Sequence, residues 1–379
     1  MRIGINTLVA VPSQIGGAQT YLRKLIESVA KIDKLNQYFL FVAPWNKDLF
    51  CVRQKNFKQI MCSIPRRFLA IRVLYEQTML PFLAWKNGID VLHSPASVSP
   101  FVLPCPSVLT MHDVAPLVLP DLTPPIFRYY WNITFKVSAR VAGPIITVSH
   151  SAKKDLVELL GIPEEKIEVI YHGSEPETPE LKEESYLRLA QKEDKSNAPY
   201  ILWVGRMYAH KNLLRLLYAY NKLITTYQGM KHQLVLCGMK AWGYPSFAKS
   251  VQDLSLQDKV VLKGYVSDDE LKQMYSNSNL FVFPSLIEGF GFPILEAMSR
   301  GVPVITSNYG AMAEIAGDAA LLVDPYDIDE IAEAMYKVLT DENLRKDLIK
   351  KGLERVSQFS WEKTARETLA VYKRLCTQK

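Results

Sequence analysis

Two glutamates, Glu288 and Glu296, stand eight residues apart in the run IEGFGFPILEA. Gly289 and Gly291 between them allow the backbone to come close to a ligand, and Pro293 suits the first position of a helix. The run therefore predicts a helix start that could hold a phosphate, with carboxylates on both sides that could bind sugar hydroxyls. The plainer alternative is a solvated loop charge at Glu288 and a helix-dipole role for Glu296.

Two cations, Arg206 and Lys211, follow the apolar run 200–204 and stand just before a helical pattern that opens near Asn212. Arginine binds phosphate oxygens in a bidentate way and lysine acts as a point charge, so the pair predicts a diphosphate site at the helix start. The alternative is two surface cations, with Asn212 merely capping the helix.

Two further segments are weaker candidates for chemistry. Gly16 and Gly17 precede a helical pattern over 18–32 whose free N–H groups could hold a phosphate, although paired glycines are more often a plain turn. His112 follows the apolar run 108–111, where an imidazole could face a cleft or serve a structural role.

A bound metal is not expected. The chain has no HExxH and no clustered Cys and His, and its one D-x-D triplet, Asp327 to Asp329, predicts an N-cap and a first-turn acid. The cysteines are odd in number and never spaced as C-x-x-C, so neither a disulfide framework nor a zinc site is indicated, and a reducing cytoplasm fits best.

Short apolar runs bounded by turn residues alternate with helical patterns, which predicts βαβ units in parallel sheets and an α/β fold. The expected strands are 2–9, 38–43, 91–93, 107–111, 144–148, 167–171, 200–204, 233–237, 260–263, 280–283, 303–306 and 320–323.

The length of 379 residues, with 48% hydrophobic and 22% charged residues, predicts two globular domains. The alternation breaks in a polar, acidic stretch, so we expect domains at 1–174 and 199–359 joined by a linker at 175–198. Parallel sheets bind ligands at the carboxyl ends of their strands, so a cleft between the two domains is the expected place for chemistry.

The net charge is +6, but residues 1–162 hold 18 Lys and Arg against 9 Asp and Glu. With the apolar-basic helical pattern 64–85, which contains Arg66, Arg67 and Arg72, this excess favours an anionic lipid surface or a lipid-diphosphate acceptor. A core-facing helix with a solvated basic edge is the alternative. No apolar run is long enough to span a membrane and no signal peptide is recognisable, so we expect a cytoplasmic protein. Peripheral attachment to the inner face of the membrane stays open at this point. The excess of basic residues is the only feature that favours nucleic-acid binding, and we do not expect nucleic acid as a partner.

The motifs, in their order, resemble those of retaining nucleotide-sugar glycosyltransferases of the family-4 type with the GT-B fold, in which two Rossmann-like doubly wound domains face a central cleft. The resemblance covers nearly the whole chain. It departs from the family at 310–314, where Gly-Ala-Met-Ala-Glu stands in place of the usual Gly-Gly-x-Pro-Glu. The matching segments are Gly16-Gly17, 148–156, 169–173, 204–212, 262–267 and the Glu288/Glu296 pair.

The resemblance implies that the C-terminal domain binds the nucleotide-sugar donor, that the N-terminal domain binds the acceptor, and that the last helix, within 360–379, packs back on the first domain. It implies no cofactor and no metal. Arg206 and Lys211 would neutralise the diphosphate, and His112 would face the reacting sugar. The other implied donor contacts are Glu288 and the backbone of Phe290, Gly291 and Phe292 to the sugar, Glu296 to the ribose, and Gly16 and Gly17 closing over the donor.

The stretch 112–173 is most similar to mannosyltransferases of bacterial surface-polysaccharide assembly, which favours GDP-mannose over a UDP-sugar. The acceptor would be a saccharide or a polyprenyl-diphosphate-linked saccharide. A nucleotide-sugar epimerase or a sugar phosphorylase on the same fold is the alternative. A sugar-binding protein and a glycoside hydrolase are weaker alternatives, because the first is usually exported and the second needs carboxyls flanking one bond.

Overall fold

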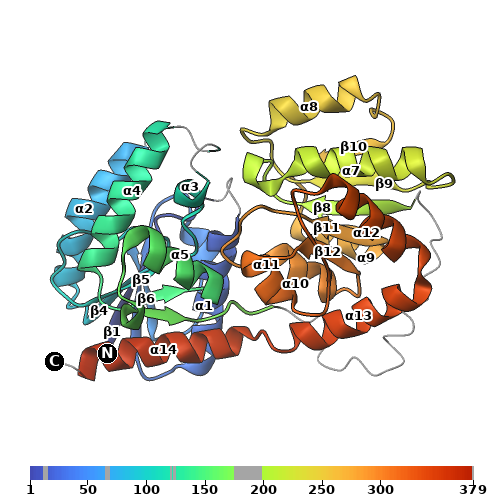
Figure 1. Cartoon of the computed structure of the whole chain (residues 1–379). Coiled ribbons are helices and arrows are strands. Elements are labelled where there is room, and N and C mark those ends of the chain that lie inside the picture. Colours follow the sequence, from blue (N-terminus) through green and yellow to red (C-terminus); the bar gives the residue numbers. More distant parts are fainter. Residues whose placement is uncertain (12–15, 65–68, 120–121, 123–124, 175–198, 378–379) are drawn as a thin grey trace. The chain divides into compact units, whose positions relative to one another are not determined.

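The computed structural model describes residues 1–11, 16–64, 69–119, 122, 125–174 and 199–377 (Figure 1). The chain divides into two compact units: unit 1 comprises Met1–Gly173 and Ser360–Lys379, and unit 2 comprises Ser174–Phe359. The linker expected at 175–198 lies outside the described residues.

Unit 1 is built on a parallel sheet of seven strands in the order β3-β2-β1-β4-β5-β6-β7. Its central strands are almost wholly buried, as expected for a parallel sheet covered on both faces. The strands are β1 (Arg2–Asn6), β2 (Gln37–Val42), β3 (Phe57–Met61), β4 (Val91–Ser94), β5 (Ser107–Thr110), β6 (Ile145–Thr147) and β7 (Ile167–Val169).

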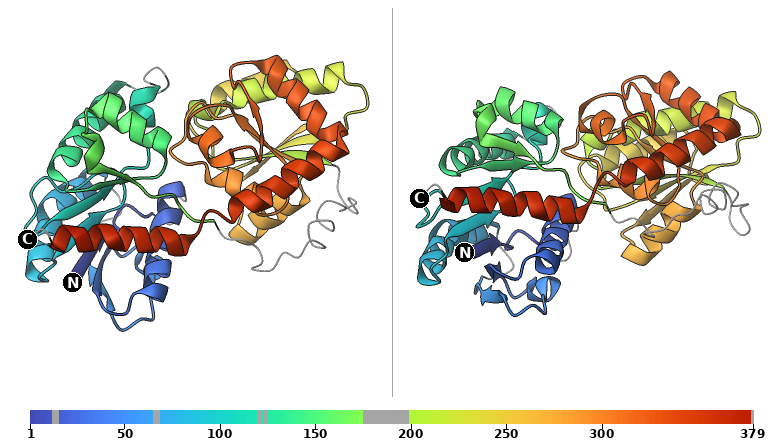
Figure 2. Two further views of the ribbon diagram at one scale, coloured as in Figure 1. Left: turned by 60° about the horizontal axis from the view of Figure 1, so that its bottom comes forward. Right: turned by 90° about the horizontal axis from the view of Figure 1, so that it is seen from below.

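Right-handed crossovers distribute the helices of unit 1 over both faces of the sheet. α1 and α14 lie together on one face, and α2, α4 and α5 cover the other (Figures 1 and 2). The helices are α1 (Gly17–Ile32), α2 (Leu69–Lys86), α3 (Ala115–Val118), α4 (Pro125–Val141), α5 (His150–Leu160) and α14 (Trp361–Thr377), with short 3₁₀ turns at Lys47–Phe50 and Glu164–Lys166.

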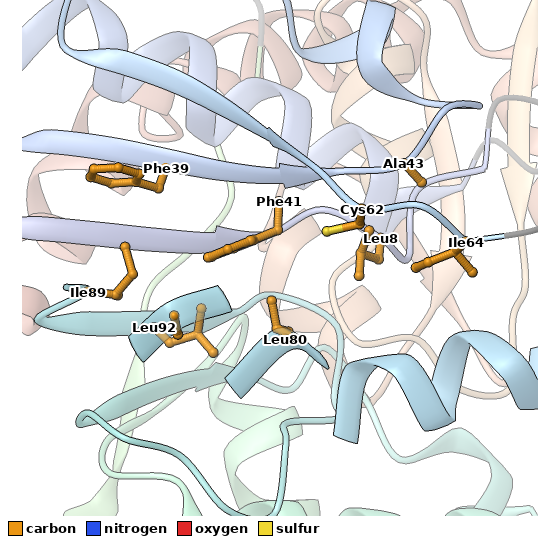
Figure 3. Packing of buried hydrophobic residues seen from close by; sticks show 10 residues of the cluster. Leu8, Phe39, Phe41, Ala43, Cys62, Ile64, Leu80, Ile89 and Leu92 are labelled. Carbon is orange, nitrogen blue, oxygen red and sulfur yellow. The ribbon is translucent and has the colours of Figure 1, made fainter. Parts of the chain in front are cut away.

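The core under α2 shows how this face is closed. Leu80 of α2 packs toward Phe41 and Leu92 of the sheet, and Leu8 and Ile64 close the carboxyl end (Figure 3). All five side chains are at most 4% exposed. This burial fixes the inner face of α2 against the sheet.

The C-terminal helix α14 is fastened to unit 1 by a polar contact as well as by packing. Tyr372 places its hydroxyl 2.6 Å from Nδ1 of His93, and both side chains are fully buried. At the start of α14, a Cβ on Gly173 would lie 2.2 Å from the Trp361 nitrogen, so only glycine fits there. The last helix thus belongs to unit 1.

Unit 2 repeats the architecture with a six-stranded parallel sheet in the order β10-β9-β8-β11-β12-β13. The strands are β8 (Tyr200–Val204), β9 (Gln233–Cys237), β10 (Val260–Gly264), β11 (Leu280–Phe283), β12 (Val304–Ser307) and β13 (Leu321–Val323). Contacts and crossover handedness place α7 and α12 on one face, and α9, α10 and α11 on the other. The helices are a 3₁₀ turn at Ala209–Lys211, α7 (Leu213–Thr226), α8 (Tyr244–Asp253), α9 (Asp268–Asn277), α10 (Phe292–Met298), α11 (Gly310–Ala316), α12 (Ile328–Thr340) and α13 (Glu342–Val356).

The expected α/β class is confirmed, and each expected strand lies within about two residues of an observed one, apart from the first, which ends at Asn6 rather than residue 9. One strand was not predicted: β3 has the half-exposed sequence FKQIM, which lacks a clear apolar alternation. The helix expected over 64–85 is described over Leu69–Lys86. Ile64 is a buried loop residue in the core, and residues 65–68 lie outside the described residues.

Candidate functional site

The centre of the candidate site in unit 2 is an ion pair between Lys211 and Glu288. Each side chain is only 15% exposed, and the Lys211 ammonium also lies 5.3 Å from the centre of the Phe283 ring. A partly buried pair of this kind is screened less by solvent than a surface pair. The structure therefore brings together two of the residues that the sequence predicted for the site.

Local backbone geometry explains why Lys211 meets Glu288. Lys211 ends a 3₁₀ turn, and Asn212 follows in the left-handed conformation at φ 60° before α7 begins. The Asn212 amide donates to the carbonyls of Pro284 (3.0 Å) and Pro325 (2.6 Å), and Leu286 donates its N–H to the His210 carbonyl (2.8 Å). These bonds tie the segment after β8 to the segment after β11. Asn212 is thus not the side-chain cap that the plainer alternative suggested.

Arg206 follows β8 at the same carboxyl edge of the sheet. Its guanidinium lies 3.5 Å from the Tyr208 hydroxyl and 3.9 Å from the Met239 sulfur. The backbone packs closely here, because a Cβ on Gly238 would lie 1.8 Å from the Gly205 carbonyl oxygen. Arg206 therefore lies on a loop that packs tightly against the loop after β9. Its side-chain contacts are with Tyr208 and Met239 and not with Lys211 or Glu288.

Glu296 is held within α10 by a neighbouring helix. The Tyr275 hydroxyl of α9 donates to Glu296 Oε2 at 2.9 Å, and Tyr275 is 1% exposed. Burial, with the nearby Glu296 carboxylate, raises the pKa of Tyr275 well above its ordinary value, so Tyr275 stays a hydrogen-bond donor. The sequence offered no signal for this partner, because it comes from a different helix.

The loop before α10 adopts a backbone conformation that requires glycine, as its sequence predicted. Gly291 is the N-cap at φ 103°, a conformation that favours glycine, and Phe292 rather than Pro293 is the first helical residue. Phe290 is buried against Phe292 and Phe359, so its side chain serves the core. Phe290, Gly291 and Phe292 can therefore contact a ligand chiefly through their backbone atoms.

The D-x-D triplet forms a helix cap, as predicted: Asp327 accepts from the N–H groups of Asp329 and Glu330 at the start of α12. The described residues contain no group of three or more His, Cys, Asp or Glu side chains that could hold a metal ion.

In unit 1, Gly16 is the N-cap of α1 and Gly17 its first residue, and both are exposed. The Gly16 carbonyl accepts from Gln19 and Thr20, which starts the helix without a side-chain cap. The first-turn N–H groups of α1 are therefore at a surface position, as an anion site would require.

His112 follows β5, and its protonation is fixed by its surroundings. Nε2 lies 2.9 Å from the Pro95 carbonyl, which can only accept, so Nε2 carries the hydrogen. Burial lowers the pKa of His112 to about 4, although the bond to Pro95 opposes the shift. The imidazole is thus neutral at pH 7, with Nδ1 as a hydrogen-bond acceptor.

A ring cluster that the sequence did not reveal surrounds His112. Tyr21 of α1 lies edge-on to His112 at 4.9 Å between centroids and contacts His172 at 4.6 Å. The Tyr21 hydroxyl bonds to Thr110 at 3.2 Å, and Thr110 bonds to Nε2 of His93 at 2.7 Å. This network joins α1, β4, β5 and α14 around the His112 loop.

The two Rossmann-like parallel sheets define the GT-B class of fold, and solved glycosyltransferase structures share it. Sucrose-phosphate synthase from Thermosynechococcus elongatus superposes with a TM-score of 0.78 at 22% identity, covering 100% of both chains. WaaG, a glycosyltransferase involved in lipopolysaccharide biosynthesis, gives a TM-score of 0.74 at 15% identity, covering 98% of this chain and 99% of WaaG.

Family comparisons agree for both halves of the chain. Residues 15–178 match the family described as Glycosyltransferase Family 4, and residues 188–355 match Glycosyl transferases group 1. The chain therefore belongs to the family-4 glycosyltransferases, and it is a glycosyltransferase.

Two named relatives are mannosyltransferases. O-antigen chain mannosyltransferase B of Escherichia coli is 32% identical over 71% of this chain and 70% of its own length. O-antigen chain mannosyltransferase RfbU of Salmonella typhimurium is 32% identical over 58% of this chain and 57% of its own length.

The environment of His112 leads to a pH prediction. We expect its imidazole to titrate near pH 4, because the folded protein favours the neutral ring. The unfolded chain takes up this proton at its ordinary pKa, so the free energy of unfolding should fall as the pH drops below about 6.5 and through 4. NMR titration of the folded protein measures the pKa of His112, and the His112→Asn variant assigns its resonance. A midpoint near pH 6.5 would contradict the account.

Proposed function

We propose that the enzyme transfers mannose, with retention of anomeric configuration, from GDP-mannose to a saccharide or polyprenyl-diphosphate-linked saccharide in surface-polysaccharide synthesis. The observation that carries the proposal is the partly buried Lys211–Glu288 pair at the carboxyl edge of unit 2. The names of the two mannosyltransferase relatives support the choice of sugar, and their O-antigen role supports the choice of pathway class.

The two cations of unit 2 suit a diphosphate leaving group. When the bond between sugar C1 and the diphosphate oxygen breaks, negative charge grows on the diphosphate and positive charge on the sugar. Fixed cations at Arg206 and Lys211 stabilise that negative charge in the transition state. The acceptor hydroxyl forms the new bond to C1 on the same face, and its proton passes to the departing phosphate oxygen. No metal is required in this scheme.

The remaining residues would position the donor. Glu288, held by Lys211, would bind hydroxyls of the transferred sugar together with the backbone of residues 290–292, and Glu296, oriented by Tyr275, would bind the ribose. Gly16 and Gly17 would close over the donor from unit 1. The Nδ1 atom of His112 would accept a hydrogen bond from a sugar hydroxyl.

Substitutions separate these roles. Lys211→Met and Glu288→Gln should each lower kcat by about 100-fold, because each acts on charge or position in the transition state. Glu296→Gln should chiefly raise the KM for donor, because ribose contacts change little as the sugar leaves. Lys222→Met is a matched control, since Lys222 forms an exposed ion pair with Asp329 elsewhere in unit 2. Near-normal kcat in Lys211→Met would remove that residue from the site.

A donor and stereochemistry experiment tests the proposed reaction. The purified enzyme is offered GDP-mannose, GDP-fucose, UDP-glucose and UDP-galactose with a panel of methyl hexosides and hexosides on a short alkyl diphosphate. We expect GDP-mannose to be preferred, an α-linked product from the α-linked donor by NMR, and full activity in excess EDTA. A β-linked product, a preferred UDP-sugar, or a loss in EDTA that magnesium restores would each contradict the proposal.

We also propose that unit 1 binds an anionic membrane surface, and the apolar outer face of α2 supports this. Leu74 is 63% exposed and Trp85 67% exposed. Further exposed apolar side chains lie on α2 at Ile71, Met79 and Phe82, and on α4, which covers the same face of the sheet, at Ile126, Tyr129 and Ile133. Single exposed apolar residues are ordinary, but several along the outer sides of two helices on the same face of the sheet favour an interaction site.

The expected role of Arg66, Arg67 and Arg72 in membrane binding has to be corrected. Arg72 is half-buried and lies 3.8 Å from the Glu76 carboxylate, so it is not a solvated surface cation. Arg66 and Arg67 lie outside the described residues. Among the helices of the described residues, none is both long enough and apolar enough to cross a membrane.

Liposome co-sedimentation tests the membrane proposal. We expect binding to anionic vesicles that weakens at high salt, and a several-fold loss in Trp85→Ala, because exposed Trp contributes apolar area at the interface. Trp242→Ala is the matched control, since Trp242 is 57% exposed in unit 2. Equal binding to neutral and anionic vesicles, or none to either, would contradict the proposal.

A further inference from the structure

We propose that Arg72 and Glu76 of α2 bind the acceptor saccharide: the guanidinium donates hydrogen bonds to hydroxyls of its terminal hexose, and the carboxylate accepts from them. The inference rests on the proposed function, because it needs a saccharide acceptor beside the transferred sugar. The sequence linked the stretch that contains Arg72 to a lipid surface or a lipid-diphosphate acceptor, whereas Glu76 and a contact of either residue with the saccharide were not assigned.

The position of Glu76 is the first observation. Glu76, Leu80 and Ala84 follow one another at intervals of four residues and form the buried line of α2 that faces the sheet. Leu80 and Ala84 pack in the core, and Figure 3 shows Leu80 near Leu8 and Leu92. Glu76, at 7% exposed, is the charged member of this line. A carboxylate is costly at such a position, so it suggests a task other than packing.

The partners of Glu76 form a polar cluster at the carboxyl end of β1. The Asn6 Oδ1 atom accepts from the Leu8 N–H at 3.1 Å, so the Asn6 amide nitrogen makes the hydrogen bond to the Glu76 carboxylate. Tyr130 of α4 interacts electrostatically with both Arg72 and Glu76. The cluster therefore joins α2, β1 and α4.

The pairing inside the cluster is incomplete. The Nε atom of Arg72 lies 3.8 Å from Glu76 Oε1, which is too long for a hydrogen bond, and this buried Nε has no hydrogen-bond partner among the described residues. Burial raises the pKa of Glu76, against the opposing effects of Arg72 and Asn6. The guanidinium of Arg72 is thus incompletely paired, and its side chain is 21% exposed, which leaves part of it open to sugar hydroxyls.

Sheet topology places the cluster near the expected point of transfer. β1 pairs with β4, and β4 pairs with β5, whose carboxyl end leads to His112. Neighbouring strands are spaced by about 4.8 Å, so the ends of β1 and β5 are roughly 10 Å apart along the same edge. This spacing lets a hexose at Arg72 and Glu76 lie next to a sugar that faces His112.

Kinetics of conservative variants test the inference. The probe is whichever methyl or alkyl-diphosphate hexoside the wild type uses best with GDP-mannose. Glu76→Gln and Arg72→Met should each lower kcat/KM for this acceptor by about 10-fold or more, because each removes a hydrogen bond to a charged group. Hydrolysis of GDP-mannose without acceptor, and the KM for GDP-mannose, should change by no more than about 2-fold. Glu76→Asp and Arg72→Lys, which keep the charges, should recover part of the loss.

Asp33→Asn supplies the matched control. Asp33 is also a buried carboxylate of unit 1, but it follows α1 at the amino edge of the sheet and binds Asn36 and Tyr38. It should lower the melting temperature and leave kcat/KM for the acceptor unchanged. If the Glu76 variants lose hydrolysis and transfer in parallel, or keep full acceptor efficiency, the inference is wrong. If instead no hexoside accepts mannose, the proposed function is at fault, and if His112→Ala leaves transfer unchanged, the placement of the acceptor beside His112 is wrong.

Discussion

The contact between Lys211 and Glu288 is the interaction on which the proposed chemistry of unit 2 depends. It ties the segment after β8 to the segment after β11, and the Asn212 bonds to Pro284 and Pro325 hold the two segments in that arrangement. A half-buried ammonium needs an anion nearby, and the carboxylate meets that need. A donor diphosphate offers the same ammonium a second anion, so Lys211 would link the leaving group to the residue that holds the sugar.

The two units contribute different electrostatics. Unit 2 presents fixed charges at the carboxyl edge of its sheet, whereas in unit 1 burial lowers the pKa of His93 to about 3, that of His112 to about 4 and that of His172 well below its ordinary value. Neutral rings cannot add positive charge beside a sugar that is itself becoming positive. In the proposed reaction, the stabilisation of the leaving group would therefore fall to Arg206 and Lys211.

The fold and the local geometry of the candidate site in unit 2 could be predicted from the sequence because both rest on local signals. Apolar runs, glycines and a proline act over a few residues, so strands such as β8 and the loop before α10 were found. Contacts made by tertiary packing left no such signal. The pairing of Tyr275 with Glu296, and of Arg72 with Glu76 and Asn6, joins residues whose proximity depends on how helices lie on a sheet. Arg72 was accordingly expected among the basic residues that face an anionic lipid surface or acceptor, although it is half-buried and lies beside Glu76.

Calorimetric titration of GDP tests the central role of the ion pair most directly, because GDP has the diphosphate but lacks the sugar. If Lys211 bridges Glu288 and the diphosphate, Glu288→Gln should bind GDP at least as tightly as the wild type, since it removes a negative charge beside the diphosphate. Lys211→Met should bind GDP about 10-fold or more weakly, the usual cost of losing a charge-assisted contact. Weaker GDP binding by Glu288→Gln, or unchanged binding by Lys211→Met, would contradict this account.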